Sequence, residues 1–303
     1  MRWEDFRQSE NIDDRRGDSD GGGGGGGFGL PIPGSGGGLG IGTIIILGLI
    51  GWAVGIDPRI LIGGAEMLSR GGQSGYSQPQ QQSQRKAGPP SDQMGRFVSA
   101  VVAMNEDVWK EALPSQKNIQ FRPAELVMFD GETRSACGKA QSAMGPFYCP
   151  VDQKMYLDTS FFNDMKRKLG GGGDFAYAYV ISHEMGHHIE NLLGILPKVQ
   201  QAQQRASSQA ESNGLSVRVE LMADCLAGVW AYHANQKFKI LEDGDVEKAV
   251  NTATAIGDDR LQQAGRGRVV PDSFTHGSSE QRVRWLQNGL KSGSIDSCNT
   301  FAR

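Results

Sequence analysis

The sequence has little net charge and no closely spaced pair of cysteines. Its formal net charge is −3 at pH 7, and it contains neither a basic cluster nor a nucleic-acid-binding motif, which argues against a nucleic-acid partner. No Cys-x-x-Cys pair occurs, so a zinc ribbon and a thiol redox motif are both excluded. The first ninety or so residues are mostly Gly, Ser, Gln, Pro and charged residues. We therefore expect one globular domain, over residues 92–303.

The chain has four cysteines: Cys137, Cys149, Cys225 and Cys298. An even number favours two disulfides if the domain is exported. The short separation of 137 and 149 favours that local pair, which leaves Cys225 to pair with Cys298. Buried free thiols are the alternative.

One long uncharged run interrupts the polar N-terminal region. Residues 39–56 have the sequence LGIGTIIILGLIGWAVGI, and as a helix they would span about 27 Å, enough for a bilayer core. A cleaved signal peptide fits less well, because the preceding region is long and contains acidic as well as basic residues. We expect a single transmembrane helix at 39–56, a disordered, charged and Gly-rich arm at 1–38, and a flexible linker at 57–91.

The orientation of this expected span depends on the cysteines. Arginines occur on both sides of the run, so the positive-inside rule is nearly balanced. Disulfides form on the oxidising side of a membrane. We therefore expect a single-pass protein of a bacterial inner membrane, with the N-terminus in the cytoplasm and the globular domain in the periplasm or outside the cell.

The globular region combines helical and β-like patterns. Apolar residues at helical spacing predict helices over 92–113, 175–193, 216–236, 245–264 and 278–290. The first helix would be capped by Ser91 or Asp92 and would end before Pro114. Short β-like pieces occur at 126–129, 146–149 and 154–157. A small sheet upstream of several helices is an α+β fold.

The expected helix 175–193 contains the pentapeptide His183-Glu184-Met185-Gly186-His187. Positions i and i+4 share a helix face, so His183 and His187 can bind one zinc ion. Glu184, beside that face, can take a proton from a metal-bound water. The alternative is two surface histidines with an incidental glutamate, which the apolar residues before the motif disfavour.

A third ligand is expected from the next helix, which contains Glu220 and Asp224 at the same i, i+4 spacing. Glu220 would bind Zn²⁺, and Asp224 would accept the second ring N–H of a ligand histidine, His183. The two acids lie among apolar residues, where a carboxylate needs a partner. A solvated helix face is the alternative.

These two motifs resemble the gluzincin type of zinc peptidase, in which Glu-x-x-x-Asp follows His-Glu-x-x-His. The whole chain, from its opening Met-Arg-Trp-Glu-Asp to the last helix, resembles the bacterial family of neutral zinc metallopeptidases. The resemblance implies a zincin-like domain. It also implies a functional segment after the metal helices, here Thr275-His276-Gly277-Ser278-Ser279 followed by Gln281-Arg282, although related membrane peptidases have proline in place of Gly277.

His276 is a candidate for stabilising the oxyanion that forms when water attacks a carbonyl. Arg282 would pair with a carboxylate near the site or brace its helix. His188 points about 100° away from the ligand face, and we interpret it and His233 as structural. The resemblance also implies an edge strand within 145–158, along which an extended peptide would lie.

The expected function is zinc-dependent endopeptidase activity on peptides or unfolded proteins. Two alternatives stay open: an envelope adaptor that keeps zinc for structure, and a chaperone that binds extended peptides without cutting them. The sequence predicts neither a specific substrate nor an oligomeric state.

Overall fold

The computed structural model describes residues 1–17, 90–168 and 172–302. The transmembrane helix expected at 39–56 and almost all of the linker expected at 57–91 lie outside these residues. Among the helices of the described part, none combines the length and the apolar character needed to cross a bilayer.

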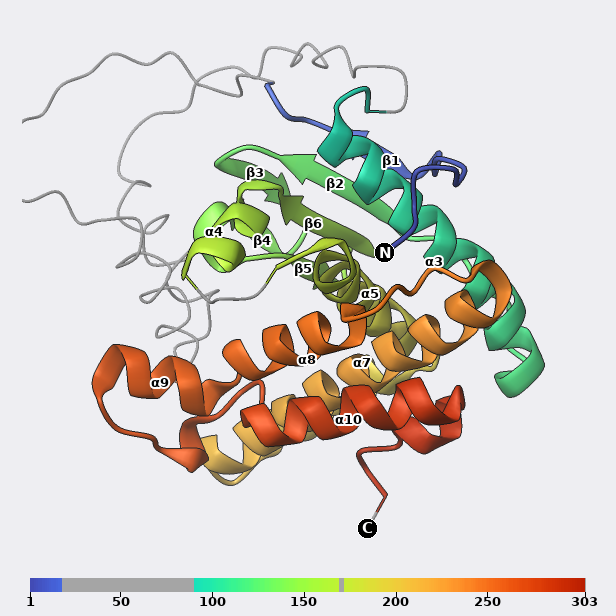
Figure 1. Ribbon diagram of the computed structural model, residues 1–303. Coiled ribbons are helices and arrows are strands. Elements are labelled where there is room, and N and C mark those ends of the chain that lie inside the picture. Colours follow the sequence, from blue (N-terminus) through green and yellow to red (C-terminus); the bar gives the residue numbers. More distant parts are fainter. Residues whose placement is uncertain (18–89, 169–171, 303) are drawn as a thin grey trace, which may run out of the picture.

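A mixed four-stranded sheet lies at one end of the domain, with strand order β1-β2-β6-β5 (Figure 1). Its strands are β1 (Ile12–Asp14), β2 (Glu125–Phe129), β5 (Phe147–Cys149) and β6 (Lys154–Asp158). The pairs β1–β2 and β2–β6 are parallel, and β5 is antiparallel to β6. A separate hairpin consists of β3 (Glu132–Ser135) and β4 (Gly138–Gln141). The three strands predicted at 126–129, 146–149 and 154–157 are confirmed.

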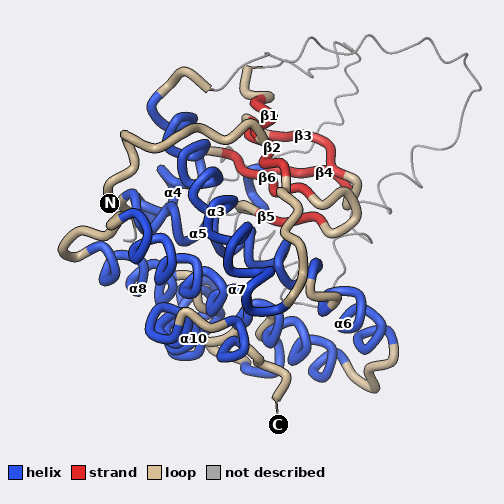
Figure 2. Tube along the Cα trace, turned by 90° about the vertical axis from the view of Figure 1, so that its right-hand side faces the viewer, coloured by secondary structure: helices blue, strands red, loops and turns tan. Residues whose placement is uncertain are grey.

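Helices form the rest of the domain. They are α3 (Gln93–Lys117), α4 (Ser160–Lys168), α5 (Asp174–Leu192), α6 (Ile195–Gln204), α7 (Gln209–Phe238), α8 (Asp245–Ala255), α9 (Asp258–Arg266) and α10 (Ser279–Ser292). The α5 helix contacts α3, α7, α8 and strand β5, and it lies between the sheet and the lower helices (Figures 1 and 2). The α+β fold class is confirmed.

Three helix boundaries differ from the sequence-based expectation; one is the start of α7, which begins at Gln209 after the N-cap Ser208 instead of at 216. The α3 helix continues through Pro114 to Lys117, because proline so near the end costs only one hydrogen bond, and Asn118 closes the helix in the left-handed conformation. The single helix expected over 245–264 is two helices separated at Gly257. A Cβ on Gly257 would lie 2.4 Å from the backbone nitrogen of Ser279, so this break lets the start of α10 approach.

The sheet has two apolar faces, because side chains alternate along each strand. Leu126, Met128 and Met155 pack in the large core with the helices. Val127 and Tyr156 belong to a smaller cluster with Ala140 of the β3–β4 hairpin. Both expected disulfides, Cys137–Cys149 and Cys225–Cys298, are formed.

The first 17 residues belong to the folded domain, which corrects the expectation of a disordered arm for that part of 1–38. Trp3 is buried edge-to-face on Phe97, and its indole N–H donates to Asp174 over 3.0 Å. Ser9 and Asn11 donate to one carboxylate oxygen of the buried Glu106, over 2.6 and 2.8 Å. The polar residues of this segment have specific partners in the domain, although its composition resembles that of a disordered tail.

The chain leaves the domain and returns to it at the same place. Arg16 forms an ion pair with Asp92 over 2.6 Å, although 75 residues separate them in sequence (residues 17–91). Because β1 also pairs with β2, residues 1–17 and 90–302 lie on the same side of any membrane. A single crossing at 39–56 would separate these two segments, so the expected orientation, with a cytoplasmic N-terminus and the domain outside, stays a prediction that conflicts with this packing.

Candidate metal centre

Three side chains from two helices meet in the interior below the sheet. His183 and His187 of α5 and Glu220 of α7 each offer a ligand atom, and these atoms all lie within 4.8 Å of one another. The two helices approach closely at Gly186, which has no side chain. A Cβ at this position would lie 3.0 Å from the Ala223 backbone. Two imidazole nitrogens and one carboxylate oxygen are a donor set of catalytic zinc sites. The residues present therefore fit zinc.

His183 is held by a second layer of buried residues. Its Nδ1 lies 2.9 Å from Asp224 Oδ1, so the other ring nitrogen, Nε2, faces Glu220 at 3.1 Å. Asp224 also accepts two hydrogen bonds of 2.9 Å from Arg282 and one of 2.6 Å from the Tyr179 hydroxyl. Burial alone would raise the pKa of Asp224, but the charges of Arg282 and His183 lower it to about 2. Asp224 is thus ionised and orients the His183 ring.

His187 is held differently, by a residue of its own helix. Its Nδ1 lies 2.8 Å from Oε2 of Glu190, and its Nε2 lies 3.7 Å from Glu220. The other oxygen of Glu190 is buried and has no hydrogen-bond partner among the described residues. Burial raises the pKa of Glu190 to about 7, against the opposing effect of His187. The sequence interpretation missed Glu190, although the i, i+3 spacing from His187 is a usable signal.

Glu184 is buried beside the ligand cluster. Burial raises its pKa, while the neighbouring imidazoles of His183 and His187 act in the opposite direction. A carboxylate whose pKa is raised toward neutrality can both accept and return a proton, as a general base must. Glu184 is therefore a candidate proton acceptor beside the ligand cluster.

His276 comes from a loop between α9 and α10 that is organised by one carboxylate. Asp258 Oδ2 accepts the backbone N–H groups of Thr275, His276 and Gly277 over 2.7, 2.7 and 3.1 Å. Its Oδ1 lies 3.2 Å from His276 Nδ1. Burial lowers the pKa of His276, but the charges of Glu220 and Asp258 outweigh this and raise it. Asp258 was not predicted, because only the tertiary fold brings α9 to this loop.

A family model described as "Putative neutral zinc metallopeptidase" matches residues 1–301. The chain belongs to this family. It is 49% identical to "Uncharacterized protein YpfJ" of Escherichia coli (strain K12) over 303 residues, covering 100% of this chain and 99% of the relative. It is 42% identical to "Uncharacterized protein Rv2575" of Mycobacterium tuberculosis (strain ATCC 25618 / H37Rv) over 221 residues, covering 68% and 72%. No solved structure matches. Membership of the family implies zinc.

The remaining two histidines have structural partners in this zinc metallopeptidase fold. His188 is fully buried between the Tyr148 hydroxyl and the Arg122 carbonyl. His233 Nε2 lies 2.8 Å from the carbonyl oxygen of Gly293. Neither belongs to the candidate metal cluster of the described residues.

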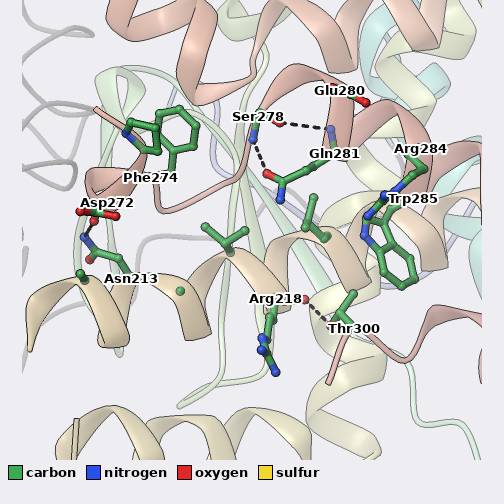
Figure 3. Close-up of a pocket in the computed structure, with 15 residues that line it drawn as sticks. Asn213, Arg218, Asp272, Phe274, Ser278, Glu280, Gln281, Arg284, Trp285 and Thr300 are labelled. Carbon is green, nitrogen blue, oxygen red and sulfur yellow. Dashed lines mark hydrogen bonds between the residues drawn. The ribbon is translucent and has the colours of Figure 1, made fainter. Parts of the chain in front are cut away.

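A cavity of about 750 Å³ lies between α7 and the start of α10 (Figure 3). It is lined by the first half of α7, by residues 271–274 and by the start of α10, where Ser278 and Gln281 exchange the hydrogen bonds of a capping box. None of the three candidate ligands lines it. Leu221, the residue after Glu220, is one of the lining residues.

Proposed function

We propose that the protein is a zinc-dependent endopeptidase that hydrolyses peptide bonds in peptides or unfolded proteins. The observation that carries this proposal is the ligand cluster of His183, His187 and Glu220 with Glu184 buried on its flank. When bound there, zinc would polarise the peptide carbonyl and lower the pKa of the attacking water. The described part of the chain supplies three ligands to this donor set, and a zinc site with three protein ligands keeps a position for that water.

The other steps of the proposed reaction are assigned to side chains of the protein. Glu184 accepts the proton of the attacking water and returns it to the leaving nitrogen. His276, oriented by Asp258, donates a hydrogen bond to the developing oxyanion. Asp224 and Glu190 hold the two ligand imidazoles in the required tautomers.

The substrate would bind along β5. Within the described residues β5 pairs only with β6, so its other edge has free backbone groups that can pair with an extended peptide. The expected range 145–158 also includes β6, but β6 lies inside the sheet between β2 and β5. Binding through backbone groups requires little sequence selectivity and suits unfolded chains.

We further propose that the domain works in an oxidising compartment of the bacterial envelope. The disulfides Cys137–Cys149 and Cys225–Cys298 support this. The uncharged run 39–56 supports attachment to the inner membrane. Such an attachment has to return the chain to the side it left, since residues 1–17 pack on the domain.

The test is cleavage of an unfolded protein by the full-length chain. We expect chelator to abolish cleavage and added zinc to restore it. Glu184→Gln should lose activity by a factor on the order of 10³ or more while binding zinc stoichiometrically. Cleavage that persists in chelator, or full activity in Glu184→Gln, would show that the proposal is wrong. Peptide binding without cleavage would support the adaptor or chaperone instead.

A further inference from the structure

The middle residue of β5 connects the free edge of the sheet to the metal helix. Phe147 stacks on Tyr156 with ring centroids 5.0 Å apart, and Cys149 is bonded to Cys137, so both face the β3–β4 hairpin. Tyr148 points the opposite way, into the core with the helices, as alternation along a strand requires. Within this three-residue strand, Tyr148 alone points toward α5.

Two residues of α5 hold the Tyr148 hydroxyl. Its oxygen lies 3.0 Å from His188 Nδ1 and accepts a hydrogen bond of 3.1 Å from Asn191. His188 Nε2 lies 2.6 Å from the carbonyl oxygen of Arg122. A carbonyl only accepts, so Nε2 carries the hydrogen and Nδ1 accepts the Tyr148 proton. The hydrogen-bonding directions of this buried group are thereby determined.

These two α5 residues directly follow two residues of the metal centre. His188 follows the ligand His187, and Asn191 follows its partner Glu190. One turn of a rigid helix therefore contacts the metal site on one face and β5 on another. We propose that Tyr148, His188 and Asn191 are positioning residues that hold the peptide-binding edge of β5 at a set distance from the metal. This inference rests on the proposed function.

The test compares two substrates in the full-length, zinc-loaded protein. One is an unstructured peptide of about ten residues, long enough to pair along β5, and the other is a blocked dipeptide amide that cannot. Tyr148→Phe should lower kcat/KM for the long peptide by about 10- to 100-fold, because a small misplacement of a bound substrate has an effect of that size. The dipeptide should be cleaved at the wild-type rate. Zinc content should not change.

Two further variants separate positioning from general stability. Asn191→Ala removes a second contact to the same hydroxyl and should reproduce the selective loss. Tyr156→Phe, in β6, removes a hydroxyl that donates to Asp152 in the turn between β5 and β6, and it should affect neither substrate. Thermal unfolding of each variant shows which fraction is folded at the assay temperature.

The outcomes distinguish this inference from the proposed function. Equal losses on both substrates, or no loss on the long peptide, would overturn the positioning role alone. Failure of the wild-type zinc protein to cleave either substrate would overturn the positioning role together with the peptidase proposal.

Discussion

The two edges of the four-stranded sheet differ in how they are used. At one edge, β1 is contributed by the N-terminal segment, whose residues Ser9 and Asn11 satisfy a buried carboxylate of α3. At the other edge, β5 has a free side among the described residues and is attached to the metal helix through Tyr148. Both β1 and β5 are outer strands of the described sheet, but the segment that contains β1 is packed onto α3, so we expect its changes to affect stability. Under the proposed function β5 binds the substrate, so we expect its changes to affect chemistry.

For the N-terminal segment that contains β1, the largest expected effect is an all-or-none result in a cysteine-labelling experiment. Glu10 and Lys110 are both exposed, one in the N-terminal segment and one on α3. Glu10→Cys and Lys110→Cys, made separately, should both react with a membrane-impermeant maleimide in intact bacterial cells with a permeable outer membrane, or both be protected. Labelling of one position only would show that the two segments lie on opposite sides of a membrane.

The next effect is a loss of stability without a loss of chemistry. Trp3→Ala should lower the free energy of unfolding by about 3–5 kcal/mol, as for other buried tryptophans. Its contacts with Phe97 and Asp174 lie away from the ligand cluster, so kcat of the folded fraction should be unchanged. Urea denaturation and turnover measured at low temperature check this. Trp3→Phe, which keeps the ring, is the matched control, and a large fall in its kcat would contradict the comparison.

A mixed effect is expected for the residues that support the two ligand histidines. Asp224→Asn should weaken zinc binding by about 10- to 100-fold and also destabilise the fold by about 3–5 kcal/mol, because buried Arg282 loses its ion pair. Glu190→Gln should weaken zinc binding by about 10-fold, the lower end of that range. It should cost little stability, since one Glu190 oxygen already has no hydrogen-bond partner among the described residues.

Zinc titration and urea denaturation, carried out on both variants, measure the two quantities separately. Equal destabilisation by the two variants would contradict the difference that the structure shows between the His183 and His187 supports.

The smallest effect is a shift in the pH profile. Burial lowers the pKa of His276, but the negative charges of Glu220 and Asp258 outweigh burial, so this pKa is raised. Protonated His276 is the stronger donor to an oxyanion, so kcat should fall as the pH rises through that pKa. Asp258→Asn removes one of the raising charges and should move this fall to lower pH. An unchanged alkaline limb would show that His276 does not titrate in the reaction.

Local patterns predicted the residues that meet in the candidate metal centre. His183 and His187, like Glu220 and Asp224, lie four residues apart on a helix, and helical geometry alone puts each pair on one face. The strands at 126–129, 146–149 and 154–157 were likewise recognisable from composition. These features depend on contacts within a few residues of sequence.

Features that depend on long-range contacts were missed or wrongly predicted. Residues 1–17 have the composition of a tail, and only their fit to Glu106 and β2 makes them part of the fold. Asp258 looks like an ordinary acid at a helix start, yet three backbone N–H groups converge on it because α9 packs beside the His276 loop. Neither property has a signature in local spacing.

The sequence by itself determined the ligand types, their spacing on two helices and the four cysteines, because these depend on residue identity and helical periodicity. The tertiary structure alone decided which carboxylate supports each histidine, which strands form the edges of the described sheet and where the N-terminal segment packs. Those outcomes depend on how α5, α7, α10 and the sheet pack, and packing brings together residues more than a hundred positions apart, such as Arg282 and Tyr179 or Trp3 and Asp174.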